Sequence, residues 1–193
     1  MAASPAALAG ALDDLKAFTR TGHAYFAGFV QSVYDAEGEL LRESTGDVSL
    51  SPPLSFRWVY DTPFKQEIVS DGETLWLYDE DLQQVTIKSA DEALAHSPIL
   101  LLTGEVALED EFAVRELGER DGLGWVELKP LDADADFDAV YAALDSAGLR
   151  VLDLRDKLGQ STQIQFNALQ VSNNANPALF RFTVPDGVDV LEQ

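Results

Sequence analysis

Aspartate recurs at every second position from residue 132 to residue 138, as do the first carboxylates of a calcium-binding loop. An EF-hand loop also needs glycine at its sixth position and a bidentate glutamate at its twelfth. Those positions hold Phe137 and Ala143, so the match fails and no calcium site is expected. We interpret these aspartates as the solvated face of a strand: Asp132, Asp134, Asp136 and Asp138.

The other signatures of catalysis or metal binding are also incomplete. The two histidines, His23 and His96, lack helical metal-site spacing and are expected in a turn and at a helix end. The chain has no cysteine, and Glu127 stands where a dinucleotide fingerprint starting at Gly122 needs its third glycine. We therefore expect no enzyme activity, no metal and no cofactor. A hydrolase with a carboxylate pair is the enzyme alternative, and turnover of a lipid ester would reveal it.

The charge of the chain excludes some classes of partner. Its 34 acidic and 13 basic residues give a formal net charge of -21, which repels nucleic-acid phosphates and anionic lipid headgroups. We expect no nucleic-acid partner, and a monomer, because this charge opposes self-association. No apolar run approaches the roughly 20 residues of a membrane span, so any contact with lipid is expected to be apolar and enclosed.

The elements that would position a binding site are predicted to be mostly strands. Leu8, Leu12, Leu15 and Phe18 have helical spacing, which predicts an amphipathic helix within residues 1–20. Short strands separated by turns then predict an antiparallel meander over residues 25–88, including an Asp71-Gly72 hairpin. Two or three short helices are expected within residues 89–110. Five more strands are predicted at 112–117, 124–129, 137–144, 149–155 and 160–169.

The strand Phe56-Arg57-Trp58-Val59-Tyr60 is predicted to place three aromatic rings on one face of the sheet and Arg57 on the other. The rings either line a ligand cavity or fill an ordinary core. Arg57 is expected to point into solvent, so that its replacement by glutamate would have little effect. The segment 74–78 is apolar on both faces, and its inner face stays unassigned.

Residues 69–79, Val-Ser-Asp-Gly-Glu-Thr-Leu-Trp-Leu-Tyr-Asp, resemble the most characteristic stretch of the LolA family of outer-membrane lipoprotein carriers. Residues 84–86, 97–102 and 177–190 support the resemblance, whose order and spacing extend over nearly the whole chain. It implies one domain over residues 1–193: a mainly β, incomplete antiparallel β-barrel covered by a lid of short α-helices. It also implies a periplasmic chaperone. Because the first five residues lack the features of an export signal, we expect that this signal has been removed.

The resemblance also implies partners and a site. Lipoproteins would be received from an inner-membrane lipoprotein-releasing ABC transporter and delivered to an outer-membrane acceptor lipoprotein. Their acyl chains would occupy a cavity lined by Phe29, Val48, Leu50, Phe56, Trp58 and Tyr60. The lid residues that compete with the acyl chains would be Leu8, Leu12, Leu15, Ile99, Leu100 and Leu101.

One departure from the family concerns the lid. Many members carry a basic pair where this chain has Ser51 and Pro52, and the arginine at the second position helps to hold the lid closed. That latch cannot be transferred to this chain. Two further alternatives remain: a LolA-like carrier of another amphiphile, such as a glycolipid or a pigment precursor, and a scaffold without a cavity. Mass spectrometry of co-purifying molecules would reveal the first, and failure of every acyl probe to bind would favour the second.

Overall fold

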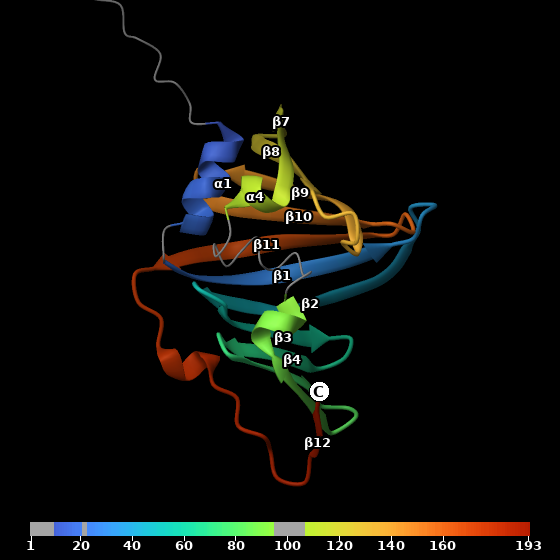
Figure 1. Cartoon of the computed structure of the whole chain (residues 1–193), viewed down its shortest axis with the longest axis vertical. Helices are drawn as coiled ribbons and strands as arrows, with labels where there is room; N and C mark the ends of the chain where they lie inside the picture. Colours follow the sequence, from blue (N-terminus) through green and yellow to red (C-terminus); the bar gives the residue numbers. More distant parts are fainter. Residues whose placement is uncertain (1–9, 21–22, 95–106) are drawn as a thin grey trace, which may run out of the picture.

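The computed structural model describes residues 10–20, 23–94 and 107–193, whose strands form one twelve-stranded sheet (Figure 1). The strand order is β12-β6-β5-β4-β3-β2-β1-β11-β10-β9-β8-β7. The strands are β1 (Ala24–Tyr34), β2 (Leu40–Ser51), β3 (Ser55–Thr62), β4 (Gln66–Asp71), β5 (Thr74–Asp79), β6 (Gln84–Ser89), β7 (Phe112–Arg120), β8 (Leu123–Pro130), β9 (Phe137–Asp145), β10 (Gly148–Asp156), β11 (Ser161–Ser172) and β12 (Asp189–Glu192). The described helices are α1 (Ala11–Arg20), α2 (Ala90–Leu94), α4 (Leu108–Glu111) and the 3-10 helix η1 (Pro177–Phe180).

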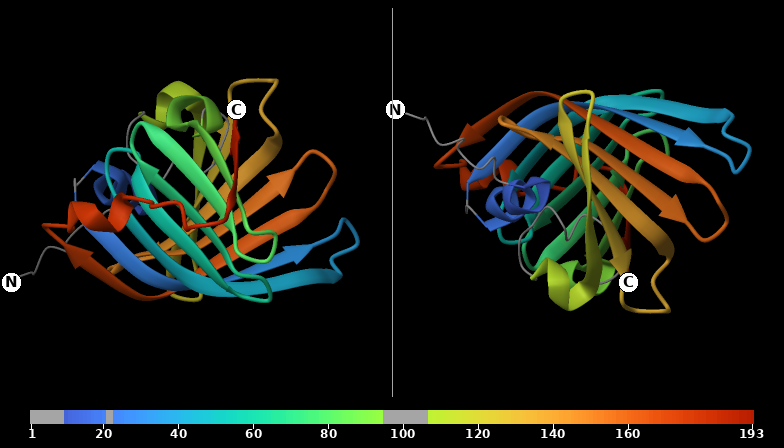
Figure 2. Two further views of the ribbon diagram at one scale, coloured as in Figure 1. Left: turned by 90° about the horizontal axis from the view of Figure 1, so that it is seen from below. Right: turned by 90° about the horizontal axis from the view of Figure 1, so that it is seen from above.

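The sheet curls into an open half-barrel, and helices α1, α2 and α4 lie at its concave side (Figure 2). Helix α1 contacts β7, β8, β9 and β10, whereas α2 contacts β5 and β6. The predicted curled sheet with few helices is thereby confirmed. None of the described helices is long and apolar enough to cross a membrane.

The two meanders follow the predicted strands and turns closely. In the β4–β5 hairpin, Asp71 Oδ1 accepts the backbone N–H groups of Glu73 at 3.0 Å and Thr74 at 2.9 Å. Gly72 adopts a φ of 101°, a left-handed conformation that glycine tolerates without steric cost. The Asp-Gly turn predicted from the sequence is therefore confirmed, with a carboxylate that satisfies the turn's backbone donors.

The convex face differs from the sequence-based expectation, because the C-terminal segment crosses it. Phe180 is buried, and the ring of Phe182 lies 6.5 Å from the ring of Trp76 and 5.6 Å from that of Tyr78. The chain then adds β12 in parallel to β6, whereas the sequence-based model contained only antiparallel strands. This cover assigns Trp76 and Tyr78 to the convex face, and Leu75 and Leu77 to the concave one.

The prediction that Arg57 points freely into solvent is wrong. Its guanidinium forms an ion pair with Glu67 on the neighbouring strand β4. Its Nη1 also donates a hydrogen bond of 3.0 Å to the carbonyl oxygen of Leu179 in η1. Arg57 therefore lies on the predicted face, but it links the sheet to the C-terminal segment.

The aspartates of residues 132–138 were also placed wrongly, because most of them lie in the turn between β8 and β9. Asp132 Oδ1 accepts the backbone N–H of Asp134 at 2.9 Å, and only Asp138 belongs to strand β9. No group of three His, Asp or Glu side chains in the described ranges is arranged to hold a metal ion. His23 immediately precedes β1, and His96 lies outside the described residues.

The predicted lid is described only in part. The N-terminal helix, predicted over residues 6–18, is observed as Ala11–Arg20, and residues 1–9 are not described. Helices α2 and α4 lie at the two ends of the predicted helical segment 89–110. Leu8, Ile99, Leu100 and Leu101 lie outside the described residues, so the lid prediction can be followed only at Leu12 and Leu15.

Candidate functional site

The six residues predicted to line a cavity share the concave face of the half-barrel. The strand register places Val48 opposite Trp58 and Leu50 opposite Phe56, while Phe29 and Tyr60 flank Gly46 of β2. Five of the six side chains are buried, and Tyr60 is half-buried. Alternation within three adjacent strands thus brings these residues to one surface.

Four aromatic rings form the centre of this surface. Phe29 lies 4.9 Å from Trp58 and 5.2 Å from Tyr60, measured between ring centroids. Phe166 of β11, a residue that the sequence-based prediction missed, lies 6.2 Å from Trp58. We call Phe29, Trp58, Tyr60 and Phe166 the aromatic cluster; its tilted and edge-on contacts are those that aromatic pairs prefer.

The second half of the sheet also contributes apolar surface. Its inward-facing apolar residues are paired across β8, β9, β10 and β11, so they continue the concave face beyond Phe166. The period-two alternation of these strands was the signal that could have identified them. The buried members of this group are Val126, Leu128, Val140, Ala142, Leu144, Leu149 and Leu152.

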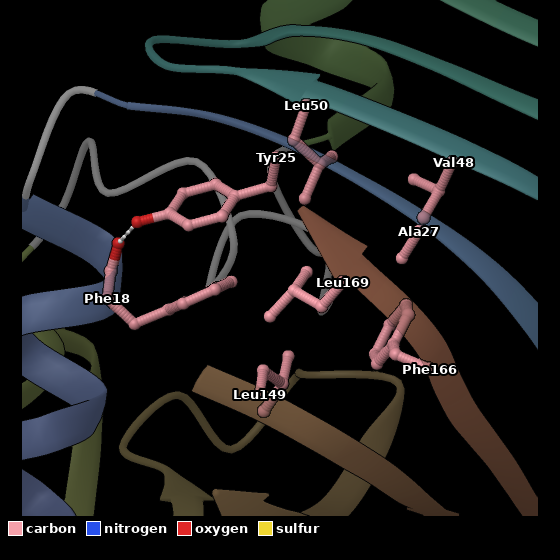
Figure 3. Close-up of a pocket in the computed structure, with 8 residues that line it drawn as sticks. All are labelled: Phe18, Tyr25, Ala27, Val48, Leu50, Leu149, Phe166 and Leu169. Atoms are coloured by element: carbon pink, nitrogen blue, oxygen red, sulfur yellow. Dashed lines mark hydrogen bonds between the residues drawn. The ribbon is translucent and has the colours of Figure 1, made fainter. Parts of the chain in front are cut away.

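The pocket between helix α1 and the sheet is narrow. The pocket between helix α1 and the sheet has a volume of only about 10 Å³, roughly the space of one water molecule. Figure 3 shows Phe18 of α1 pointing into this space toward the sheet. The lining residues are Phe18, Tyr25, Ala27, Val48, Leu50, Leu149, Phe166 and Leu169. The space is too small for an acyl chain while Phe18 occupies it.

Polar contacts hold helix α1 against the sheet at both of its ends. Near its start, the carboxylate of Glu116 on β7 accepts the backbone N–H of Leu12 at 2.8 Å, which satisfies a free donor of the first turn. Near its end, the Tyr25 hydroxyl donates to the carbonyl oxygen of Phe18 at 2.7 Å (Figure 3). Lys16 forms an ion pair with Glu109 of α4. These contacts stabilise the closed position of α1.

Glycine 124 allows the helix to approach the sheet closely. A Cβ atom at this position of β8 would lie only 2.7 Å from the Cβ atom of Ala11, which is closer than two such atoms can pack. Leu15 and Phe18, on the same helix, are buried against the concave face. The small residues Gly124 and Ala11 and the polar contacts therefore all favour a position of α1 close to the sheet.

Replacing Tyr25 by phenylalanine should loosen this closed state. The variant loses one buried hydrogen bond, worth about 1 kcal/mol, so the affinity for an acyl probe should rise about fivefold if opening precedes binding. Fluorescence titration with a fatty-acid probe measures the change. Tyr34→Phe, at the far end of the same strand, is the matched control and should leave the affinity unchanged. Equal affinities for all three proteins would contradict the role of this contact.

This chain is similar to a known protein family along most of its length. The family model described as outer membrane lipoprotein carrier protein LolA matches residues 20–183. An outer-membrane lipoprotein carrier protein of Methylococcus capsulatus is 40% identical, over 92% of this chain and 86% of the relative. A protein of the same description from Dechloromonas aromatica is 37% identical, over 95% of this chain and 88% of the relative.

Solved structures support the same fold. An uncharacterized conserved protein of Thermus thermophilus superposes with a TM-score of 0.62 at 14% identity, covering 95% of this chain and 97% of that one. The LolA superfamily protein NE2245 of Nitrosomonas europaea has a TM-score of 0.51 at 11% identity, covering 89% and 96%. With the family model matching most of its residues and its sheet curled around an apolar interior, this chain belongs to the outer membrane lipoprotein carrier protein LolA family.

Proposed function

We propose that this protein is a periplasmic chaperone that carries lipoproteins by enclosing their acyl chains. The observation that carries this proposal is the concave face, which is apolar from β8 around to β5. Helix α1 packs on this face and is held there by hydrogen bonds to Glu116 and Tyr25. Phe29, Val48, Leu50, Phe56, Trp58 and Tyr60 are proposed to contact the acyl chains, together with Phe166. Family membership supports the same cargo.

The closed interior accounts for reversible binding. Each CH₂ group removed from water contributes about 0.8 kcal/mol, so an acyl chain would bind an empty apolar trough very tightly. Here Leu15 and Phe18 already occupy part of the trough, and they must be exposed before cargo covers the same surface. The free energy of opening offsets part of the binding free energy. The net affinity is then moderate, which suits a carrier that must release its cargo.

A carrier is proposed rather than an enzyme because of where the buried carboxylates lie. Among the described residues these are Glu127 and Asp153, and both lie on the convex face, away from the aromatic cluster. Arg115 donates hydrogen bonds to Glu127 and lowers the pKa of its carboxyl, and Arg155 pairs with Asp153. Both acids therefore have charged partners of their own and do not face the apolar trough.

The proposed cycle has a donor and an acceptor outside this chain. Cargo is received from an inner-membrane lipoprotein-releasing ABC transporter and passed to an acceptor lipoprotein of the outer membrane. The protein is proposed to act in the periplasm, with its export signal removed. The cargo-free protein is proposed to be a monomer, because its net charge of -21 opposes self-association.

Depletion of the protein in its native host tests this function. Lipoproteins should accumulate in the inner membrane, because their acyl chains cannot cross water without an apolar host. Re-expression of the wild-type protein should restore their transfer to the outer membrane. Normal lipoprotein sorting in depleted cells would contradict the proposal. Mass spectrometry of the purified protein would then show whether a glycolipid or a pigment precursor is carried instead.

A further inference from the structure

One end of the concave face is polar, and the function proposed above gives this end no role. Along β1 the inner position after Phe29 is Gln31, and along β3 the one after Trp58 is Tyr60. On β4 and β5 the inner positions change from Ile68 to Gln66 and from Leu77 to Asp79, which lie opposite each other. The apolar surface therefore gives way to polar groups at the same level of several adjacent strands.

These polar groups line a pocket of about 430 Å³. The hairpins β3–β4 and β5–β6 contribute Phe64 and Leu82 to its lining, two residues that are 66% and 68% exposed. The remaining lining residues are Gln31, Arg42, Ser44, Tyr60, Pro63, Gln66, Asp79 and Asp81. Tyr60 belongs both to this pocket and to the aromatic cluster, so the pocket continues directly from the apolar surface.

The chemistry of the pocket fits a peptide backbone. Each amino-acid residue of a peptide offers one N–H donor and one carbonyl acceptor, and a glutamine amide can satisfy both. The Tyr60 hydroxyl donates to Gln31 Oε1 at 3.0 Å, and burial raises the pKa of Tyr60, so the hydroxyl stays protonated. This bond orients the Gln31 side chain. Gln66, opposite Tyr60 in the register, supplies the second amide.

The charges of the pocket disfavour an anionic headgroup. Arg42 is the only basic residue among the lining side chains, against the two carboxylates of Asp79 and Asp81. A phosphate or a free carboxylate would gain one attraction and meet two repulsions. A neutral peptide meets neither penalty, so charge and hydrogen-bonding capacity favour a lipoprotein over an anionic phospholipid.

We propose that this pocket binds the first peptide residues that follow the acylated residue of the cargo, an assignment that rests on the proposed lipoprotein-carrier function. The acyl chains then lie on the aromatic cluster, and the peptide leaves through the hairpin end beside Gln31 and Gln66. Cargo is thereby recognised at two adjoining surfaces. The polar one distinguishes a lipoprotein from other molecules with similar acyl chains.

Binding of three ligands tests the assignment: a tripalmitoylated cysteine amide, the same compound extended by an amidated tetraserine tail, and phosphatidylglycerol. Displacement of a fluorescent fatty acid measures each affinity. The tail should increase the affinity of the wild-type protein about tenfold, as expected for one or two net hydrogen bonds. Gln66→Leu should abolish this gain and leave the affinity for the tail-free compound and for phosphatidylglycerol unchanged.

Gln84→Leu is the matched control, because Gln84 lies opposite Asp79 on β6 but does not line the pocket. It should retain the tenfold gain. A wild-type protein that does not distinguish the two cysteine compounds would overturn the assignment while leaving acyl carriage intact. The assignment would also be overturned if Gln66→Leu lowered the affinity for phosphatidylglycerol as much as the affinity for the tailed ligand, since the pocket would then be a general headgroup site. If neither cysteine compound binds the wild-type protein, acyl carriage fails and this assignment fails with it.

Discussion

Replacing Phe56 by glutamate is expected to abolish acyl-chain binding. Phe56 is only 1% exposed and lies opposite Leu50 on the concave face. An ionised carboxylate at this position costs several kcal/mol in apolar surroundings, and the acyl chains also lose the contact with the ring. The affinity for a fatty-acid probe should fall more than about 100-fold. Fluorescence titration at neutral pH measures this loss.

Two companion variants separate the charge from the packing of Phe56. Phe56→Leu keeps an apolar side chain and should lose no more than about tenfold in affinity, at some cost in stability. Tyr60→Glu places the carboxylate at a half-buried position at the margin of the aromatic cluster, where the fold tolerates it better. Circular dichroism must first show a native spectrum. A folded Phe56→Glu or Tyr60→Glu protein that binds the probe normally would show that acyl chains lie elsewhere.

Replacing Arg57 by glutamate should destabilise the protein strongly, although the residue lies on the opposite face from Phe56. The new carboxylate would face Glu67 and would no longer donate to the carbonyl oxygen of Leu179. Breaking a fully buried pair costs about 3–5 kcal/mol, and this pair is partly exposed to solvent, so a loss of about 2 kcal/mol is expected. The C-terminal segment should detach, so limited proteolysis should cleave it faster than in the wild-type protein.

The destabilisation should depend on pH in a defined direction. Burial raises the pKa of Glu67 in the folded protein, and the positive charge of Arg57 opposes this rise. Without Arg57 the pKa rises further, so the protonated carboxyl is favoured by folding and the variant loses stability as the pH rises through that folded-state pKa. Denaturant unfolding should show a smaller deficit near pH 4 than at pH 7. Arg120→Glu, at an exposed end of β7, is the control and should change stability by less than about 0.5 kcal/mol.

The concave face of the first meander could be predicted from the sequence because strand alternation is a local property. Phe56, Trp58 and Tyr60 share a face whatever surrounds them, since successive side chains of a strand point in opposite directions. What covers each face is a tertiary property. The Arg57 prediction failed for this reason: the face was correct, but the segment that packs on it lies more than 100 residues later in the chain.

Strand β12 and the second half of the concave face were missed for different reasons. The four residues of β12 are too few for an alternation signal. They form a strand because they pair with β6, and this pairing is not visible in their own sequence. The apolar positions of β8 to β11 did alternate, but the prediction of a cavity rested on three strands from the first meander. The polar pocket at Gln31 and Gln66 was not foreseen either, because its members come together only through the register of several strands.

The strand order has a consequence for how quickly the protein can fold. Strands β1 to β6 and β7 to β11 pair with their sequence neighbours, but the two meanders meet only where β1 pairs with β11. Closing that pair spans roughly 130 residues, which costs about 3 kcal/mol more loop-closure entropy than a four-residue hairpin. Pairing of such high sequence separation is slow, so we expect the seam to form late. Phe29 and Phe166 lie directly across it, so the proposed acyl-binding surface is completed only at that late step.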